Sequence, residues 1–173
     1  MRKIIILLLA LLLTSCDGIV SYLTPAHYYA LTDLDKQAIT LVFGSGFVQT
    51  IQDHIYTKDL PYGSGIGGMY SPEANEIWMN ENAEIACYKV AHEATHYYQA
   101  NVLNEDFGDS DQPRKVPKNL LNKLDAEQEA NIVELYVYFS LAGDGPVSLD
   151  GGIYDSPIKE KLETYIKTFI VHN

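Results

Sequence analysis

The stretch His92-Glu93-Ala94-Thr95-His96 lies near the middle of this 173-residue chain. One helical turn takes 3.6 residues, so His92 and His96 project from the same face of a helix, about one turn apart. Two imidazole nitrogens in that arrangement can bind one zinc ion. Glu93 lies beside this face and can reach a water at the metal without taking a ligand position. The spacing predicts a zinc site with His92 and His96 as ligands and Glu93 as the catalytic general base.

At these residues the chain resembles the zincin metallopeptidases. Residues 92–99 are close to the H-E-x-x-H-x-x-Q variant found in short bacterial zincin domains. Gln99 and Val102 stand where the metzincin branch has glycine and histidine, so that branch is excluded. The resemblance implies zinc as the cofactor and a third protein ligand from elsewhere in the chain. The alternative is an ordinary helix surface, but the uncharged neighbours Ala94 and Thr95 favour a metal site.

The best source of a third ligand is a second helical segment, Asp125 to Asn131. This segment resembles the gluzincin E-x-x-x-D signature, in which the glutamate binds zinc and the residue four positions later supports a ligand histidine. The resemblance makes Glu127 the ligand and Asn131 the supporting residue, with asparagine in place of the usual aspartate. Glu129 points about 200° away around the helix and is the reserve candidate. The alternative for these acids is a solvated helix face.

Three protein ligands leave a fourth zinc position for water, whose pKa falls to about 7 on the metal. Glu93 would accept the proton of this water and deliver it to the leaving amine. Tyr138, eleven residues beyond Glu127, is the candidate donor to the developing oxyanion. We expect a peptide substrate to align with the strand Glu76–Met79 by β-addition.

The N-terminus predicts export and lipidation. A basic start is followed by the apolar run Ile4–Leu13, which is too short to span a membrane and is typical of a signal peptide. Leu13-Thr14-Ser15-Cys16 resembles the lipobox of bacterial lipoproteins, in which the cysteine becomes the lipidated first residue. Asp17 resembles the inner-membrane retention signal of enteric bacteria, where it would place the protein on the periplasmic side. The alternative is an ordinary secretory signal with an incidental cysteine.

Composition narrows the class of protein. The net charge of −11 repels phosphate backbones, so nucleic acid is not an expected partner. If Cys16 is lipidated, Cys87 has no cysteine partner and is expected to be a small core residue. The length favours one folded domain. We therefore divide the chain into a signal peptide (1–15), a lipidated cysteine and tether (16–31) and a catalytic domain (32–173).

Hydrophobic periodicity and turn residues predict the elements of this domain. Between residues 47 and 60 the pattern suits either a helix or a strand. A hairpin is expected from Gly68 to Asn80, with its turn at residues 72–75. Helices are expected at residues 33–43 after a Thr32 cap, at about 82–102, at 117–142 and at 158–171, with turn-rich residues at 143–157.

Together these features predict an α+β fold of minimal zincin-like architecture, with a small sheet, an active-site helix and a packed glutamate-bearing helix. The expected function is a lipid-anchored zinc metallopeptidase that cleaves peptides or proteins at the bacterial cell envelope. The alternative is a catalytically silent zinc-binding scaffold that binds a partner there. A third option is hydrolysis of a non-peptide amide, such as one in the cell wall.

Overall fold

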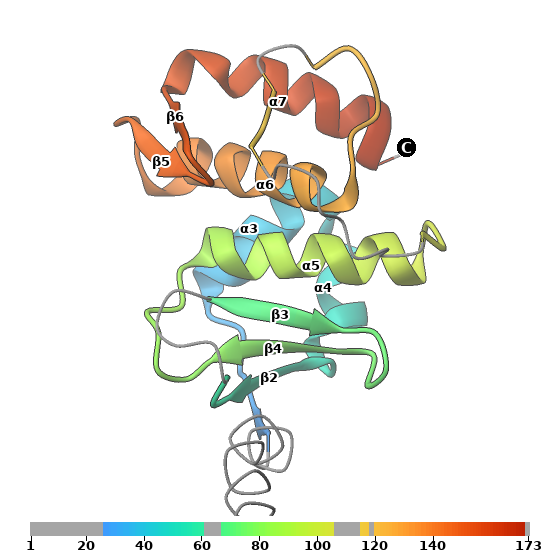
Figure 1. Cartoon of the computed structure of the whole chain (residues 1–173). Helices are drawn as coiled ribbons and strands as arrows, with labels where there is room; N and C mark the ends of the chain where they lie inside the picture. Colours follow the sequence, from blue (N-terminus) through green and yellow to red (C-terminus); the bar gives the residue numbers. More distant parts are fainter. Residues whose placement is uncertain (1–25, 61–66, 106–114, 118–119, 172–173) are drawn as a thin grey trace, which may run out of the picture.

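A small β-sheet and a stack of helices make up the α+β fold of this chain (Figure 1). The computed structural model describes residues 26–60, 67–105, 115–117 and 120–171. The predicted signal peptide, the lipidation site Cys16 and Asp17 lie outside these residues. In chain order the elements are β1 (His27–Tyr28), α3 (Asp33–Phe43), α4 (Ser45–Gln52), β2 (Ile55–Lys58), β3 (Gly68–Ser71), β4 (Glu76–Asn80), α5 (Cys87–Asn101), α6 (Ala126–Val137), the π-helix η2 (Tyr138–Ala142), β5 (Val147–Leu149), β6 (Gly152–Tyr154), the 3-10 helix η3 (Ser156–Ile158), α7 (Lys159–Tyr165) and the π-helix η4 (Ile166–Ile170).

The main sheet has the strand order β1-β2-β4-β3. β4 pairs in parallel with β2, with Ile77 opposite Ile55, and antiparallel with β3, with Met79 opposite Gly68. The expectation that a substrate adds to the strand Glu76–Met79 is therefore wrong, because the backbone groups of β4 are already paired on both sides. Among the described strands, β3 has the free edge on that side of the sheet.

Helix α5 lies at the centre of the molecule, between the sheet and α6 (Figure 1). Val90, Ala94 and Tyr97 on one face join the core shared with the sheet, α3 and α4. Cys87 and Ala91 on another face join the core shared with α6 and α7. Because α5 is packed on both of these faces, the helix cannot rotate about its axis. The orientation of its polar side chains, which include His92 and His96, is therefore fixed.

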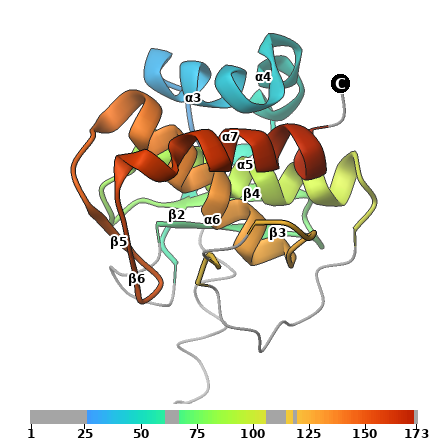
Figure 2. The ribbon, with the colours of Figure 1, turned by 90° about the horizontal axis from the view of Figure 1, so that it is seen from above.

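Helices α3 and α4 lie to one side of the stack formed by α5, α6 and α7 (Figure 2). The expected helix at residues 33–43 is confirmed, together with its cap. Thr32 Oγ1 accepts a hydrogen bond from the Asp35 backbone N–H, and Asp35 accepts one from the Thr32 N–H. Gly44, at φ +84°, ends α3 and allows α4 to begin at the next residue.

The ambiguous stretch 47–60 contains both elements, because α4 ends at Gln52 and β2 begins at Ile55. The expected hairpin at residues 68–80 is confirmed, with its turn at 72–75. Asn75 adopts φ +56° in this turn, a conformation that asparagine tolerates.

Two helix starts differ from expectation. α5 begins at Cys87 rather than near residue 82, because Asn80 accepts hydrogen bonds from the backbones of Asn82 and Ala83 and forms a turn. α6 begins at Ala126 rather than at residue 117, because the Asp125 side chain caps it through the Gln128 N–H.

Three strands, β1, β5 and β6, were not expected. The turn-rich region 143–157 contains the hairpin β5–β6, and the predicted tether contains β1, which pairs with β2. Leu31 is also buried, so the folded unit includes residues before Thr32. In the part of the chain that the structure describes, no helix is long and apolar enough to span a bilayer.

Candidate metal centre

Helices α5 and α6 pack against each other in opposite directions. Gln99, near the end of α5, contacts the start of α6 at Ala126, while Tyr88 near the start of α5 contacts Tyr138 just beyond the end of α6. This packing turns the face of α5 that carries His92 and His96 toward the first turns of α6. Side chains of the H-E-x-x-H stretch therefore meet side chains of the segment Asp125 to Asn131.

The structure brings His92, His96 and Glu127 into one group whose possible ligand atoms all lie within 4.8 Å of one another. The two Nε2 atoms of the histidines are 3.3 Å apart. The Glu127 carboxylate oxygens lie 3.8 Å from Nε2 of His92 and 3.6 Å from Nε2 of His96. The histidine side chains are 13% and 7% exposed and that of Glu127 is 31% exposed, so solvent reaches the group beside Glu127.

The tautomer of His96 follows from its hydrogen bond to Gln99. The Gln99 Nε2 group donates to the Ala126 carbonyl at 3.3 Å and to Glu129 Oε2 at 3.0 Å, which orients the amide. Its Oε1 atom therefore faces Nδ1 of His96, 3.2 Å away, and accepts that proton. His96 Nε2 is left with a lone pair directed at the group.

Glu134 determines the tautomer of His92. Its Oε2 atom lies 3.0 Å from Nδ1 of His92, within ion-pair distance, and neither atom has a hydrogen-bond partner among the described residues. The other oxygen of Glu134 lies 2.6 Å from Lys89 Nζ. A carboxylate at Nδ1 requires a proton there, which leaves Nε2 of His92 with a lone pair as well.

The residues fit a bound metal ion. Two lone pairs facing each other at 3.3 Å repel unless a cation or a proton lies between them. Metal–ligand bonds of about 2.0–2.1 Å in a tetrahedral zinc site place the ligand atoms roughly 3.4 Å apart. The separations of 3.3 to 3.8 Å in this group agree with that value.

The net charge around the two histidines also favours a bound cation. Among the described residues, the carboxyl groups of Glu93, Glu127 and Glu134 face the ammonium group of Lys89, which leaves a formal charge of −2 when all three carboxyl groups are ionised and both histidines are neutral. Burial opposes the charging of His92, but its contact with Glu134 and the nearby carboxylates outweigh this and raise its pKa. The centre therefore attracts positive charge, which a divalent cation supplies.

Glu93 is 6% exposed and lies between α5 and strand β3. A Cβ atom at Gly68 would lie 2.9 Å from Cγ of Glu93, so the two elements approach this closely because residue 68 is a glycine. Burial raises the pKa of Glu93 to about 7, although the charge of His92 opposes the rise. Its carboxyl group can therefore hold or release a proton near neutral pH.

The other expected site residues lie elsewhere. Glu129, the reserve ligand, is fully buried and accepts hydrogen bonds from Gln99 and Tyr165. Asn131, the expected support for a histidine, donates to Asp150 at 2.8 Å, and the carboxylate at His92 Nδ1 is that of Glu134.

Tyr138, the expected oxyanion donor, lies in η2 with its ring packed edge-on against Tyr88 at 5.6 Å. Eleven residues of helix separate it from Glu127, which is roughly 16 Å along the axis. The Tyr138 hydroxyl lies instead beside Gly143, where an added Cβ would be 3.4 Å from it, and so at the far end of the helix from Glu127.

Sequence reasoning missed the roles of Glu134, Lys89 and Gln99. Glu134 follows Glu127 by seven residues, or about two helical turns, so it lies on the same stripe of α6. Lys89 precedes His92 by three residues and shares its face of α5. These spacings were the available signals, but they do not show which side chain of α6 meets which histidine.

Comparisons with protein family models, curated proteins and solved structures find no match for this chain. The chemistry of the residues that α5 and α6 bring together is therefore the basis for assigning a function.

Proposed function

We propose that this protein is a lipid-anchored zinc metallopeptidase with a zincin-like domain, acting at the bacterial cell envelope. One observation carries the proposal. Two imidazole lone pairs and the Glu127 carboxylate converge at 3.3 to 3.8 Å, next to the buried carboxyl group of Glu93. Two histidines, one glutamate and an open position are the ligand set of catalytic zinc in proteases.

His92, His96 and Glu127 would hold the metal. When bound, zinc supplies Lewis-acid activation of water and of the scissile carbonyl group. Zinc suits the two imidazoles better than magnesium or calcium, which prefer sites made of oxygen ligands.

Glu93 performs the proton transfers. Its carboxylate accepts a proton from the attacking water and then delivers this proton to the leaving nitrogen of the peptide. The buried position of Glu93 suits this role, because its pKa of about 7 allows both protonation states near neutral pH. Glu134 and Gln99 keep the two histidines oriented throughout the reaction.

An extended peptide substrate would pair with the free edge of β3. This strand passes close to Glu93, since a Cβ added at Gly68 would lie 2.9 Å from Cγ of Glu93. A peptide that adds to β3 therefore runs past the general base. The proposed docking strand is therefore β3 and not β4, because β4 is paired on both sides.

The anchor is proposed from the sequence. Leu13-Thr14-Ser15-Cys16 supports lipidation of Cys16, and Asp17 supports retention at the inner membrane if the enteric sorting rule applies. Several acyl chains on one cysteine anchor a protein stably, whereas one chain holds it only marginally.

Metal analysis of the purified full chain tests the centre. We expect about one zinc per chain, as a three-ligand site requires, and loss of this zinc in His96→Ala and in Glu127→Ala. The control is His27→Ala, because His27 is exposed on β1 and distant in sequence from the group. A parent chain that binds no zinc would refute the proposal.

Cleavage of a mixed peptide library separates the enzyme from the alternative scaffold. We expect the zinc-loaded parent to cleave peptides, and both zinc-free variants to be inactive. Zinc binding without any cleavage would instead favour a silent scaffold that binds a partner at the envelope.

A further inference from the structure

A buried chain of hydrogen bonds leads from the last helix to the candidate metal ligand His96. The Tyr165 hydroxyl, at the end of α7, lies 3.0 Å from Glu129 Oε1. The other oxygen of Glu129 lies 3.0 Å from Gln99 Nε2, and Gln99 Oε1 lies 3.2 Å from His96 Nδ1. These four side chains, the relay residues, come from three different helices.

With Glu129 ionised, each hydrogen bond of the relay has only one possible direction. The Leu124 backbone N–H donates to the Tyr165 hydroxyl at 2.7 Å, so the hydroxyl proton goes to Glu129. The carboxylate of Glu129 only accepts, so Gln99 must donate to it. The amide oxygen of Gln99 is thereby presented to His96, whose Nδ1 must carry the proton. A change at Tyr165 or Glu129 therefore reaches the metal-binding nitrogen of His96.

The relay is closed to solvent. Gln99 and Glu129 are 0% exposed and Tyr165 is 1% exposed. A buried carboxylate is costly unless its hydrogen bonds are satisfied, so this arrangement tolerates few alternatives. Rotation of any one of these groups would leave a buried donor or acceptor without a partner.

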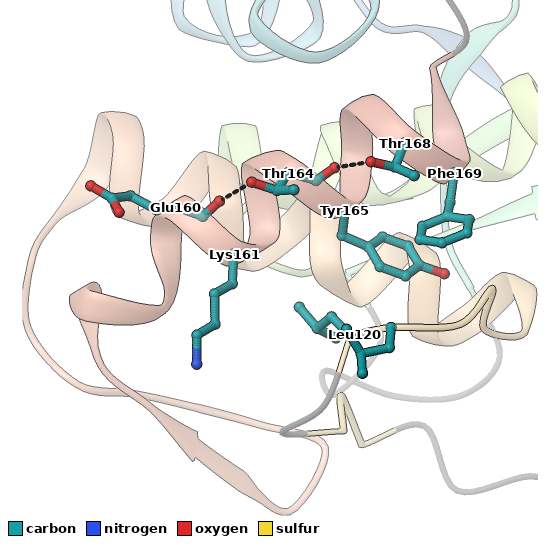
Figure 3. Close-up of a pocket in the computed structure, with 8 residues that line it drawn as sticks. Leu120, Glu160, Lys161, Thr164, Tyr165, Thr168 and Phe169 are labelled. Carbon is teal, nitrogen blue, oxygen red and sulfur yellow. Dashed lines mark hydrogen bonds between the residues drawn. The ribbon is translucent and has the colours of Figure 1, made fainter.

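Tyr165 also lines a surface pocket of about 650 Å³, shared with Leu120 and Phe169 (Figure 3). Its ring packs on Phe169 with the centroids 4.8 Å apart. The packing of α7 against the rest of the molecule thus determines where the Tyr165 hydroxyl lies.

We propose that Gln99, Glu129 and Tyr165 are positioning residues that hold His96 in its metal-binding tautomer and couple the docking of α7 to metal affinity. This inference rests on the proposed metal centre but does not require peptidase activity. Partners of metal-binding histidines typically contribute 10- to 100-fold to metal affinity.

An exchange of residues tests the relay. Gln99→Glu places two carboxylates against each other, and Glu129→Gln opposes the amide of Gln99 with a second amide. We expect each single variant to weaken zinc binding about 10- to 100-fold in a chelator competition assay. The double variant Gln99→Glu/Glu129→Gln restores the match between positions 99 and 129 and with His96, since the carboxylate at position 99 would accept from His96 and from the amide at position 129. It gives up only the longer bond of position 99 to the Ala126 carbonyl, at 3.3 Å. We expect its zinc affinity to return to within a few-fold of the parent value.

Tyr165→Phe tests the last link and Tyr154→Phe is its matched control. Tyr154 is also buried and its hydroxyl donates to the Val116 carbonyl, but it does not contact the relay. We expect Tyr165→Phe to weaken zinc binding and Tyr154→Phe to leave it unchanged. Thermal unfolding of the metal-free variants identifies the temperature range in which all are folded. If a single variant does not fold, the double variant must both fold and bind zinc.

Parent-like zinc affinity in the single variants would refute the relay, and so would a folded double variant that stays weak. Nitrogen-15 NMR of the imidazoles tests the relay without any metal. It therefore separates failure of the relay proposal from failure of the metal-centre proposal. In the metal-free parent we expect a proton on Nδ1 of His96, and a shift of this proton to Nε2 in Glu129→Gln. If the parent binds no zinc but shows this tautomer change, the metal centre fails and the relay stands. An unchanged tautomer in Glu129→Gln refutes the relay.

Discussion

The two histidines of the candidate centre are supported by different chemistry. A charged pair, Glu134 with Lys89, faces His92, whereas the neutral amide of Gln99 faces His96. A carboxylate makes the imidazole a more basic ligand than an amide does. Substitution of either support should therefore weaken metal binding.

Glu93→Gln is predicted to keep zinc and to lose peptide cleavage. The amide preserves the size of the side chain but cannot accept and return a proton, so turnover should fall by roughly 10²- to 10⁴-fold. Peptide turnover and zinc content measured on the same sample check this. Glu73→Gln, in an exposed turn, is the control. Wild-type turnover in Glu93→Gln would show that another group is the general base.

Glu134→Gln is predicted to weaken zinc binding by about 10- to 100-fold, because His92 loses its charged support. The matched control is Glu163→Gln. Glu163 and Glu134 each pair with a lysine at 2.6 Å, but the pair of Glu163 with Lys167 lies on the surface. Chelator competition measures both variants, and equal affinities for the two would contradict the role assigned to Glu134.

At the scale of elements, the site depends on how closely β3 and α5 approach. A Cβ at Gly68 would lie 2.9 Å from Cγ of Glu93 and 3.0 Å from Sδ of Met79. Both neighbours are buried, so neither can move away freely. The glycine therefore permits Glu93, the proposed general base, to lie beside the free edge of the sheet.

Gly68→Ala is predicted to destabilise the protein by about 1–3 kcal/mol and to reduce cleavage while zinc content is retained. Overpacking would displace either β3 or the Glu93 side chain. Gly46→Ala is the control, because a Cβ there meets nothing within 4 Å. Urea unfolding and peptide turnover are the measurements. If Gly68→Ala matched the parent in both, close packing of β3 on α5 would not be needed for function.

At the scale of the whole molecule, the proposed ligands come from α5 and α6, which also carry the core between the sheet and α7. A metal bound to both helices would hold them together only in the folded chain. Such a ligand shifts the folding equilibrium toward the native state.

Zinc at 100 times its dissociation constant is predicted to add about 2.7 kcal/mol of stability. For a domain of this size, that is a rise in Tm of roughly 5–10 °C. Thermal unfolding with and without a chelator measures the effect. The rise should be absent in His96→Ala. An identical rise in that variant would mean that zinc binds somewhere else.

Rules for helix capping, turns and helical spacing correctly predict the features that involve residues close together in the sequence. The capping residues Thr32 and Asp35 define the start of α3, and the residues 72–75 define the hairpin turn. The spacing of His92 and His96 is enough to place both on one helix face. Such features involve residues a few positions apart, so their geometry depends little on the rest of the chain.

Packing between distant segments decided the strand order and the contacts between helices. Strand order, which buries β4 and exposes the edge of β3, depends on pairings between distant segments. The hydrogen bond from the Leu124 backbone N–H, just before α6, to the Tyr165 hydroxyl joins residues 41 positions apart. Rules for local spacing could not anticipate either feature.

By itself, the sequence determined the H-E-x-x-H helix and the choice of Glu127 as the residue to look for on a second helix. Only the tertiary structure decided that Glu134 faces His92 and that Gln99, Glu129 and Tyr165 lead to His96. The physical reason is that ligand spacing is a property of one helix, whereas the partner of each imidazole depends on how three helices pack around it.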